Sequence, residues 1–480
     1  MFKLSIYFKI ILLSALLLVG CKKLVDVKNP NNRLLKEVVF STDQAAIGVL
    51  NNLFIGISTG LYSGELSSIP LITGLSSDEL IIYDFNINQE FTWYYQNNFT
   101  PQLFQTNPLI WGNVYSKIYT INDAISGLSE ATKLTASVRN QLLGEAKFLR
   151  AFCYFYLTNL FGDVALAITP DYKVTGQLSR ISQDEIFKQI IDDLLDAQSL
   201  LSDKFLDGTL LKETTERVRP TKWAATALLA KVYLYTKKYD LSEQEATKVI
   251  SNNTLFRLDS LNMTFLKNSN EAIWQIQPTQ DIFNTMNGSF FVLSDGIGPE
   301  FSKPTYLNNR LVKSFEIGDR RKAVWTGVAR DTANGIDYYY PYKYKAYLPI
   351  QPSDPLTEYY MMLRLGEQFL IRSEARAEQN KLSDALEDLK KIRNRAWLPD
   401  IKPTNKSELL SAIQHERQVE LFVEWGDRWF DLRRTGNIDK VMSIVTPEKG
   451  NSQWSNYKKY LPIPVSEIRA NAHLTQTQGY

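Results

Sequence analysis

The chain has 480 residues, of which 44% are hydrophobic and 22% are charged, with a formal net charge of +2 at pH 7. This is enough apolar material for a large core, and there is no acidic or basic tail. A chain so close to neutral argues against nucleic-acid binding and against electrostatic capture of a strongly charged ligand.

The first twenty residues predict a secretory signal. Lys3 and Lys9 lie before a short apolar stretch over residues 10–19, and Gly20 and Cys21 follow it. This order is typical of signal peptides, and the stretch is shorter than the roughly 20 residues that a transmembrane helix needs. Leu-Val-Gly-Cys at 18–21 resembles a bacterial lipobox and predicts lipidation of Cys21. An ordinary cleaved signal beside a cysteine is the alternative.

We therefore expect residues 1–20 to be a lipoprotein signal peptide and 21–40 to be a lipidated tether. Residues 41–480 would form a single domain. The signal contains two lysines and no acid, so the remaining chain has 52 basic and 52 acidic side chains. Anchoring to a membrane would then rest on lipid rather than on charge.

Long helices dominate the remaining pattern. Residues 111–128 place apolar side chains at spacings of three and four, which predicts an amphipathic helix. Similar helices are expected over residues 138–161, 183–201, 221–238, 242–250, 358–380, 382–397 and 407–424. Residues 222–252 and 363–396 have the size of tetratricopeptide helix–turn–helix units, about 34 residues each. Since one such hairpin cannot bury its apolar face alone, periodicity predicts an irregular stack of helical hairpins.

Two segments, around 60–108 and 252–350, break this pattern. They are rich in Gly, Pro, Asn, Ser and aromatic residues, with short strand-like runs at 271–277 and 290–293. Irregular segments of this length are uncommon in compact domains unless they are functional, so we expect the ligand site there.

Sugar rings stack on aromatic side chains, and peptides use similar surfaces. The first segment offers Tyr83, Trp93 and Tyr95, and the second offers Trp325 and Tyr339. Trp93 and Tyr95 are the best candidates because polar residues surround them and no helical stripe includes them. The alternative for each is ordinary packing, because large aromatic side chains dominate cores. Trp111, Trp223 and Trp429 lie on predicted helices and are expected in the core.

Catalysis is disfavoured. Glu416, Glu420 and Glu424 recur every four residues and share one helix face, as a metal cluster or an acid–base pair would. However, the chain has only His415 and His473, so no zinc-like ligand set exists, and no calcium-binding loop of EF-hand type appears. We expect these carboxylates to pair structurally with arginines, drawn from Arg393, Arg395, Arg433 and Arg434.

The same structural interpretation applies to Glu145, Arg150 and Asp431, which lie among apolar helical residues. Cys153 lies in an apolar helical stretch and is interpreted as a small buried hydrophobe rather than a nucleophile. The sequence therefore predicts no cofactor, no metal site and no enzymatic activity. A hydrolase that uses two carboxylates leaves no short motif and stays as an alternative.

Six blocks of the chain, in order, resemble the SusD/RagB family of outer-membrane lipoproteins. They are Trp-Gly-Asn-Val-Tyr at 111–115 with Asn-Asp-Ala-Ile at 122–125, Glu-Ala-Lys-Phe-Leu-Arg-Ala at 145–151 with Phe-Gly-Asp-Val at 161–164, Arg-Pro-Thr-Lys-Trp-Ala-Ala at 219–225, Ile-Arg-Asn-Arg-Ala at 392–396, Arg-Trp-Phe-Asp-Leu-Arg-Arg at 428–434, and Leu-Pro-Ile-Pro at 461–464 with the terminal Gln-Gly-Tyr. Departures are small. Thr477 and Gln478 replace Asn-Pro before the final Gly-Tyr, and Trp425 replaces a glycine.

This resemblance implies a mainly α fold of about four tetratricopeptide-like helix pairs with large irregular insertions. It implies non-catalytic binding of a nutrient oligomer, most simply a glycan, at the cell surface. It also implies delivery to a SusC-type TonB-dependent outer-membrane transporter. A peptide ligand, a glycoside hydrolase and a pure helical-repeat scaffold are the alternatives.

Overall fold

The computed structural model describes residues 36–58, 66–86, 88–101, 109–279, 284–351, 353–450 and 453–480. Cys21 and the predicted signal peptide lie outside this part of the chain. Among the described residues, no helix has the length and apolarity needed to cross a membrane.

The N-terminal half is built around one long buried helix. Helix α7 (Ala136–Phe161) is buried along almost its whole length, which is why its hydrophobicity shows little amphipathic bias. It packs against α3 (Asp43–Ser58), α6 (Leu109–Glu130) and α9 (Gln183–Leu200). It ends at Gly162, whose φ of 78° lies in the region that glycine adopts without strain.

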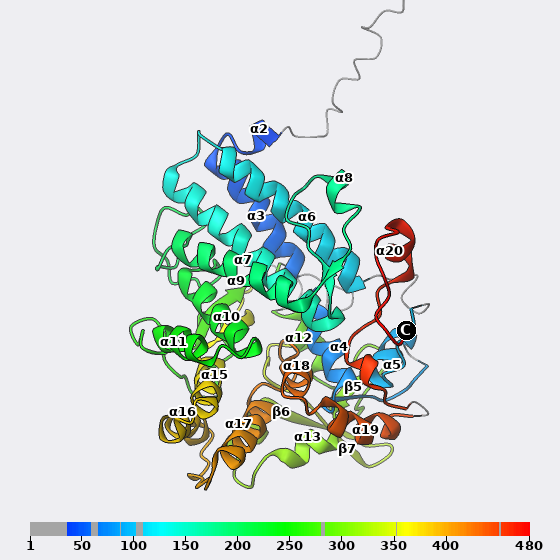
Figure 1. Ribbon diagram of the computed structural model, residues 1–480. Helices are drawn as coiled ribbons and strands as arrows, with labels where there is room; N and C mark the ends of the chain where they lie inside the picture. The colour runs from blue at the N-terminus through cyan, green and yellow to red at the C-terminus, as the bar shows by residue number, and fades with distance from the viewer. Residues whose placement is uncertain are drawn as a thin grey trace, which may run out of the picture.

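The helical stack continues into the C-terminal half (Figure 1). Helix α9 packs on α10 (Lys222–Tyr235), α10 on α11 (Tyr239–Ile250), and α11 on α15 (Leu365–Glu378). Helix α15 then contacts both α16 (Leu382–Arg395) and α17 (Lys406–Glu420). The predicted mainly α class with stacked hairpins is confirmed.

Local sequence explains several helix starts in this stack. Ser182 and Glu185 form a capping box at the start of α9, each side chain bonding the other's backbone N–H. Thr221 accepts from the backbone N–H of Trp223 at the start of α10, directly after Pro220. Both starts fall within one residue of the boundaries expected from the sequence.

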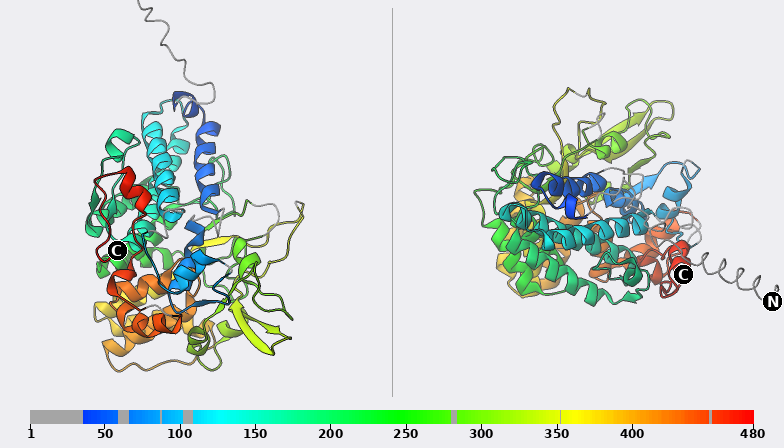
Figure 2. Two further views of the ribbon diagram at one scale, coloured as in Figure 1. Left: turned by 90° about the vertical axis from the view of Figure 1, so that its right-hand side faces the viewer. Right: turned by 90° about the horizontal axis from the view of Figure 1, so that it is seen from above.

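The two insertions hold most of the strands, together with short helices. The first contains η2 (Leu66–Ser68), α4 (Ile69–Ser76), β1 (Leu80–Ile82) and α5 (Gln89–Tyr95). The second contains β4 (Ala272–Ile276), α12 (Met286–Phe291), β5 (Thr305–Leu307), α13 (Asn309–Ser314), α14 (Arg320–Trp325), β6 (Thr326–Asp331) and β7 (Ile336–Pro341). In the left view of Figure 2 the β6–β7 hairpin projects from the side of the molecule opposite to α16 and α17.

Three expectations about these segments were wrong. Residues 290–293 were expected as a strand, but Phe290 and Phe291 are the last residues of α12, and Val292 and Leu293 lie in no strand. Parts of both insertions are helical rather than irregular. The helix expected from residue 358 begins only at Leu365, because Tyr360–Arg364 form strand β8, which pairs with β4. Every residue of β8 is buried, so the run has no period by which to recognise a strand.

A continuous hydrophobic core among the described residues extends from Phe40 to Leu474. Trp274 of β4 lies at its centre, edge-on to Phe148 at 5.0 Å and Phe152 at 5.4 Å. Cys153 is fully buried beside them, which confirms it as a core residue. Trp111 and Trp429 are also buried, whereas Trp223 is only partly so.

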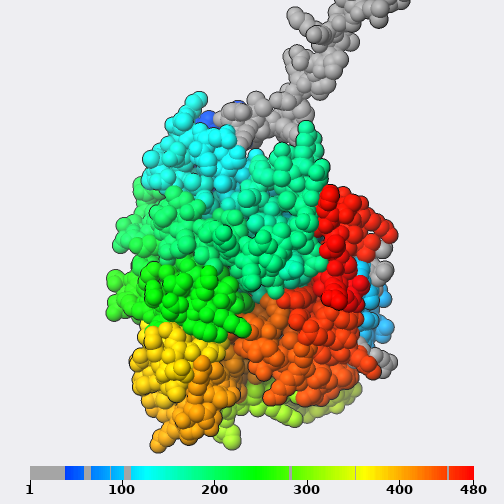
Figure 3. Space-filling model, viewed as in Figure 1, coloured from blue at the N-terminus to red at the C-terminus, as the bar shows by residue number. Residues whose placement is uncertain are grey.

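The C-terminal part closes the fold. Helices α18 (Asp427–Arg434) and α19 (Ile438–Glu448) lead to η3 (Asn456–Lys459) and α20 (Val465–Ala470). A short excursion after α7, comprising β2 (Val164–Ala165), α8 (Tyr172–Thr175), β3 (Arg180–Ile181) and the residues between them, lies near α20. Figure 3 shows the red C-terminal segment directly against this part of the N-terminal half.

Candidate functional site

The two insertions meet in one surface, although residues 109–251 separate them in the sequence. Strands β1 and β5 pair antiparallel, with Ile81 opposite Tyr306. The pairing continues beyond β1, because the backbone N–H of Tyr83 donates to the carbonyl of Pro304 at 3.0 Å. Side chains from both insertions can therefore contact one ligand.

A series of rings crosses this junction. Phe85 lies 5.9 Å from Tyr95, centroid to centroid, and Tyr306 lies 4.9 Å from Tyr338 of β7. Burial raises the pKa of Tyr95 to about 12, and the nearby Tyr306 contributes to this rise. The two rings therefore lie close together. We call Tyr83, Phe85, Phe301, Tyr306 and Tyr338 the aromatic face.

Three residues of the aromatic face have large solvent-exposed fractions, unlike aromatic residues that pack in the core. Tyr83 is 41% exposed, Phe85 46% and Phe301 76%. Partial burial, together with the nearby carboxylates of Asp84 and Glu300, raises the pKa of Tyr83. Its hydroxyl therefore stays protonated at neutral pH and can donate a hydrogen bond.

Polar side chains accompany these rings. One oxygen of Asp84 accepts from both the backbone and the side-chain nitrogen of Asn86, at 2.9 and 3.1 Å. Beyond Phe85 lies an open pocket of about 610 Å³. Its described lining is Phe85, Gln96, Asn98, Gly450, Gln453, Ser455, Tyr457 and Lys458. Rings, amides and a hydroxyl are the groups that bind sugar faces and sugar hydroxyls, and the size is typical of ligand pockets.

A buried lysine, Lys449, packs against Tyr95 behind the aromatic face. Lys449 donates to the carbonyls of Leu75, Ser76 and Ser77 at the end of α4, and its ammonium lies 5.2 Å from the centre of the Tyr95 ring. Burial lowers the pKa of Lys449 to about 7, opposed by the charge of Asp78. This cluster fixes α4 and α5 against each other and holds Tyr95 in place.

The predicted site residues differ in exposure and in position relative to the aromatic face. Tyr83 and Tyr95 belong to or support the aromatic face, but Tyr95 is only 7% exposed and so acts as support. Trp93 lies on the short helix α5 and is half-buried. The buried face of this helix includes Tyr95 but not Trp93, so the expectation that no helical stripe includes the two was wrong for Tyr95 alone. The carbonyl of Trp93 accepts from the backbone N–H of Asn98, a pocket residue, at 3.0 Å. A ligand contact by Trp93 stays a prediction.

Trp325 is not a surface residue, and its assignment to the site is corrected. It has no exposed surface, and its indole N–H donates to the carbonyl of Leu261 at 2.8 Å. Its ring packs edge-on against Phe265 at 5.6 Å, and the charged groups of Lys343, Arg364 and Arg395 lie within 6 Å of it. It is a core residue next to a buried ion-pair network.

Tyr339 lies on the opposite face of its strand from Tyr338, and a ligand contact by Tyr339 stays a prediction. Alternation along β7 turns Tyr338 toward Tyr306, whereas Tyr339 packs on the core with Lys322 5.7 Å from its ring centre. The sequence argument missed Phe85, Phe301, Tyr306 and Tyr338. Phe85 could have been found, because it lies among Asp84, Asn86 and Asn88 in a segment already selected.

The carboxylate series is a structural network. Glu416 and Glu420 are fully buried, and Glu424 lies close to them. Arg321 contacts Glu416 and Glu420 at 2.5 and 3.0 Å, and Arg364 contacts Glu420 and Glu424 at 2.6 and 2.9 Å. Although burial opposes ionisation, Arg395, Arg364 and Arg321 hold the pKa of Glu420 well below its ordinary value. All three carboxylates are thus held by cations.

The predicted arginine partners are half right. Arg393 and Arg395 do contact Glu416 and Glu420, but Arg433 bonds Asn159, and Arg434 bonds Glu374 and Asp431. Arg433 and Arg434 are the last residues of α18 and make no ion pair with Glu416, Glu420 or Glu424 among the described residues. The other structural pairs form as expected, with Glu145 bound to Arg219 and Arg150 bound to Asp193.

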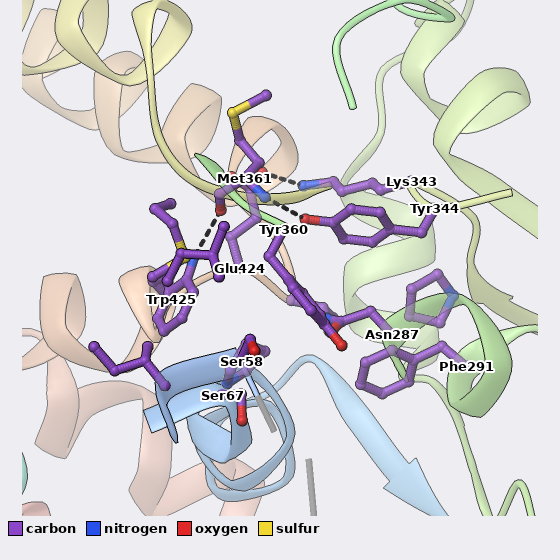
Figure 4. Close-up of a pocket in the computed structure, with 16 residues that line it drawn as sticks. Ser58, Ser67, Asn287, Phe291, Lys343, Tyr344, Tyr360, Met361, Glu424 and Trp425 are labelled. Atoms are coloured by element: carbon purple, nitrogen blue, oxygen red, sulfur yellow. Dashed lines mark hydrogen bonds and ion pairs between the residues drawn. The ribbon is translucent and has the colours of Figure 1, made fainter. Parts of the chain in front are cut away.

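Figure 4 shows the end of this network at an internal cavity. Lys343 contacts Glu424 at 2.6 Å, and the indole of Trp425 donates to the carbonyl of Met361 at 2.7 Å. The cavity holds about 30 Å³, room for a water molecule and too small for a sugar ring. Among the described residues, no group of three His, Cys, Asp or Glu side chains is arranged to hold a metal.

Two family models match the chain. One, described as "SusD family", matches residues 271–480, and the other, described as "Starch-binding associating with outer membrane", matches residues 26–234. The chain belongs to the SusD/RagB family. The SusD-like protein P2 of Formosa agariphila is 26% identical, with 98% of each chain aligned. The starch-binding protein SusD of Bacteroides thetaiotaomicron is 29% identical over 25% of this chain and 21% of its own.

Solved structures of SusD-type proteins share the fold. A SusD superfamily protein from Bacteroides vulgatus superimposes with a TM-score of 0.78 at 19% identity, covering 92% of this chain and all of its own. Surface glycan-binding protein A from Bacteroides thetaiotaomicron gives 0.75 at 19% identity, with 92% of this chain and 100% of its own covered. At this identity these likenesses show the fold alone.

Proposed function

We propose that this SusD/RagB protein binds a glycan at the cell surface through the aromatic face and the adjoining pocket. The observation that carries the proposal is the exposure of Tyr83, Phe85 and Phe301 on a surface to which both insertions contribute. An exposed ring costs free energy in water and stacks well on the apolar face of a sugar. The names of a starch-binding relative and a glycan-binding structural neighbour support the same ligand class.

We further propose that binding occurs without hydrolysis. Cleavage of a glycosidic bond needs two carboxyl groups on opposite sides of the bond. The described lining of the pocket contains amides, rings, a serine and Lys458, but no carboxyl group. The two carboxylates near Tyr83 both lie on the aromatic face, where Asp84 accepts from Asn86 and Glu300 accepts from Ser302. The glutamates that suggested an active site are buried in ion pairs instead.

The proposed cellular role is capture for a SusC-type TonB-dependent transporter. A lipid on Cys21 would hold the protein at the outer membrane, in agreement with the family description that associates such chains with that membrane. Substitution Cys21→Ser should then remove palmitate labelling and move the protein out of the membrane fraction. Labelling that survives the substitution would refute the anchor.

A glycan array probed with the full mature chain tests the ligand class. We expect binding to one family of oligosaccharides, with each oligosaccharide recovered at its original length after incubation. Peptide arrays provide the opposing arm. Binding to peptides but to no glycan would replace this proposal by a peptide-binding function, and shortened oligosaccharides would replace it by a hydrolase.

Substitution Trp93→Ala tests the extent of the site once the glycan is known. We expect a loss of more than tenfold in affinity if Trp93 extends the aromatic face, because a central aromatic anchor commonly contributes roughly 2 kcal/mol. Unchanged affinity would restrict the site to the aromatic face and the pocket beyond Phe85.

A further inference from the structure

A second groove shares no lining residue with the aromatic face. It is lined by residues of α6, of the excursion at residues 165–178 and of α20, three segments that are labelled in Figure 1. Its volume is about 290 Å³. Four aromatic side chains line it: Trp111, Tyr115 and Tyr119, spaced by four residues along α6, and Tyr172 of α8. Tyr119 is 53% exposed and Tyr172 73% exposed, so the rings on the two sides of the groove face solvent.

One charged residue, Glu467 of α20, appears in the described lining of this groove. Its carboxylate accepts a hydrogen bond from the indole N–H of Trp111, and burial raises its pKa. No ion pair forms to Glu467 from any residue that the structure describes. Arg180, which lies near Tyr115, instead donates to the carbonyls of Asp163 and Thr475 and to Thr477.

Several other polar groups of the groove are engaged within the protein. The amide nitrogen of Asn122 donates to Ala167, and its oxygen accepts from Arg150, both at 2.9 Å. Asn471 donates to the carbonyl of Leu178 at 2.9 Å, and Tyr115 donates to the carbonyl of Ala165 at 2.7 Å. The hydroxyls of Tyr119, Tyr172 and Thr175 also line the groove but are neutral, so Glu467 is the charged group in its described lining that can distinguish one ligand from another.

What the groove does offer is an uncompensated carboxylate, aromatic faces and an apolar wall. The wall consists of Ala165, Ala167, Leu178, Ala470 and Leu474. Aromatic faces attract cations, and a partly desolvated carboxylate gains from an opposite charge. An apolar wall fits the aliphatic stem that precedes the charge in a lysine or arginine side chain.

We propose that this groove binds a lysine or arginine side chain presented by another polypeptide. The cationic head would lie against Glu467, next to the rings of Trp111 and Tyr115. The stem would cover the apolar wall and run toward the exposed rings of Tyr119 and Tyr172. This site is independent of glycan binding at the aromatic face, and neither proposal depends on the other.

The test is calorimetric titration of the full mature chain with Nα-acetyl-lysine-N-methylamide. We expect this probe to bind and its uncharged norleucine analogue to bind roughly fivefold more weakly or not at all. Titration with glucosamine tests whether a cationic sugar binds the groove instead. Equal binding of the lysine and norleucine probes, or glucosamine binding as tight as that of the lysine probe, would overturn the proposal.

Two variants locate the site. Glu467→Gln should weaken the lysine probe by roughly fivefold or more, and Tyr119→Leu, at an exposed ring outside the core, should weaken it to a similar degree. The control Glu387→Gln removes an exposed carboxylate that pairs with Lys390 on α16 and should leave binding unchanged. Normal binding by Tyr119→Leu and Glu467→Gln would place the cation elsewhere. If Glu467→Gln does not fold, Tyr119→Leu decides alone.

Discussion

The glutamate network around α17 and the aromatic face use their side chains in opposite ways. In the network, Glu420 has three arginines within ion-pair distance and no exposure to solvent. On the aromatic face, the rings of Tyr83, Phe85 and Phe301 are exposed to solvent. The network resembled an active site in sequence, yet its groups are already satisfied. Function is better sought where side chains still have an open face.

The largest expected effect is on the network side. Glu420→Ala leaves Arg321, Arg364 and Arg395 buried without their shared carboxylate, so we expect a loss of roughly 3–5 kcal/mol in unfolding free energy. Urea denaturation measures it. The matched control is Glu387→Ala, whose side chain is 62% exposed and pairs only at the surface. Equal stability of the two variants would show that the network does not hold the C-terminal helices.

A second pair of variants compares a buried with an exposed aromatic residue within the same insertion. Trp325→Ala removes a fully buried ring and should cost about 3–5 kcal/mol. Phe301→Ala removes a ring that is 76% exposed and should change stability by less than about 0.5 kcal/mol. Thermal melts of both variants decide. A large loss in Phe301→Ala would mean that the aromatic face is part of the structural core.

A smaller effect concerns pH. Burial, and then the charge of Asp78, raises the pKa of Glu79 to about 8 from its ordinary value of 4.5. Between pH 5 and 7 the folded chain therefore keeps a proton that the unfolded chain releases, so stability falls as pH rises. We expect the unfolding free energy of Glu79→Gln to decrease by about 1–2 kcal/mol less than that of the wild type between pH 5 and 7. Parallel stability–pH curves for the variant and the wild type would contradict the assignment.

Periodicity, together with helix-forming composition, predicted most helices of the stack. Helices such as α9 and α16 have a repeating buried stripe, whereas α7 is buried almost all round and was recognised by its strong helix formers and by Gly162 at its end. Periodicity failed at β8, where Tyr360, Met361, Met362 and Leu363 are all buried and leave no period to read. It also failed to name Arg321 and Arg364 as partners of the glutamates. Those contacts join residues 56 and 99 positions apart, which only the tertiary fold brings together.

The site was predicted less well than the frame. The placement of the site in both insertions stays a prediction. The pairing of β1 with β5 shows that they share a surface, but the choice of residues depended on a strand register that the sequence does not reveal. A run of three tyrosines at 338–340 does not reveal which one faces outward. Gly327 lies opposite Tyr340, and the ring occupies the space that a side chain at Gly327 would need. Such local fits fix the register, and with it the position of Tyr338.

The account rests on the claim that the aromatic face, and not the helical frame, binds the ligand. Calorimetric titration of Tyr83→Ala/Phe85→Ala with the glycan selected by the array tests this most directly, with Trp397→Ala as control. Trp397 is 75% exposed and lies at the end of α16. The double variant should bind more than tenfold more weakly, a loss above about 1.4 kcal/mol, while the control should bind normally. Normal binding by the double variant, with a wild-type melting temperature, would contradict the claim.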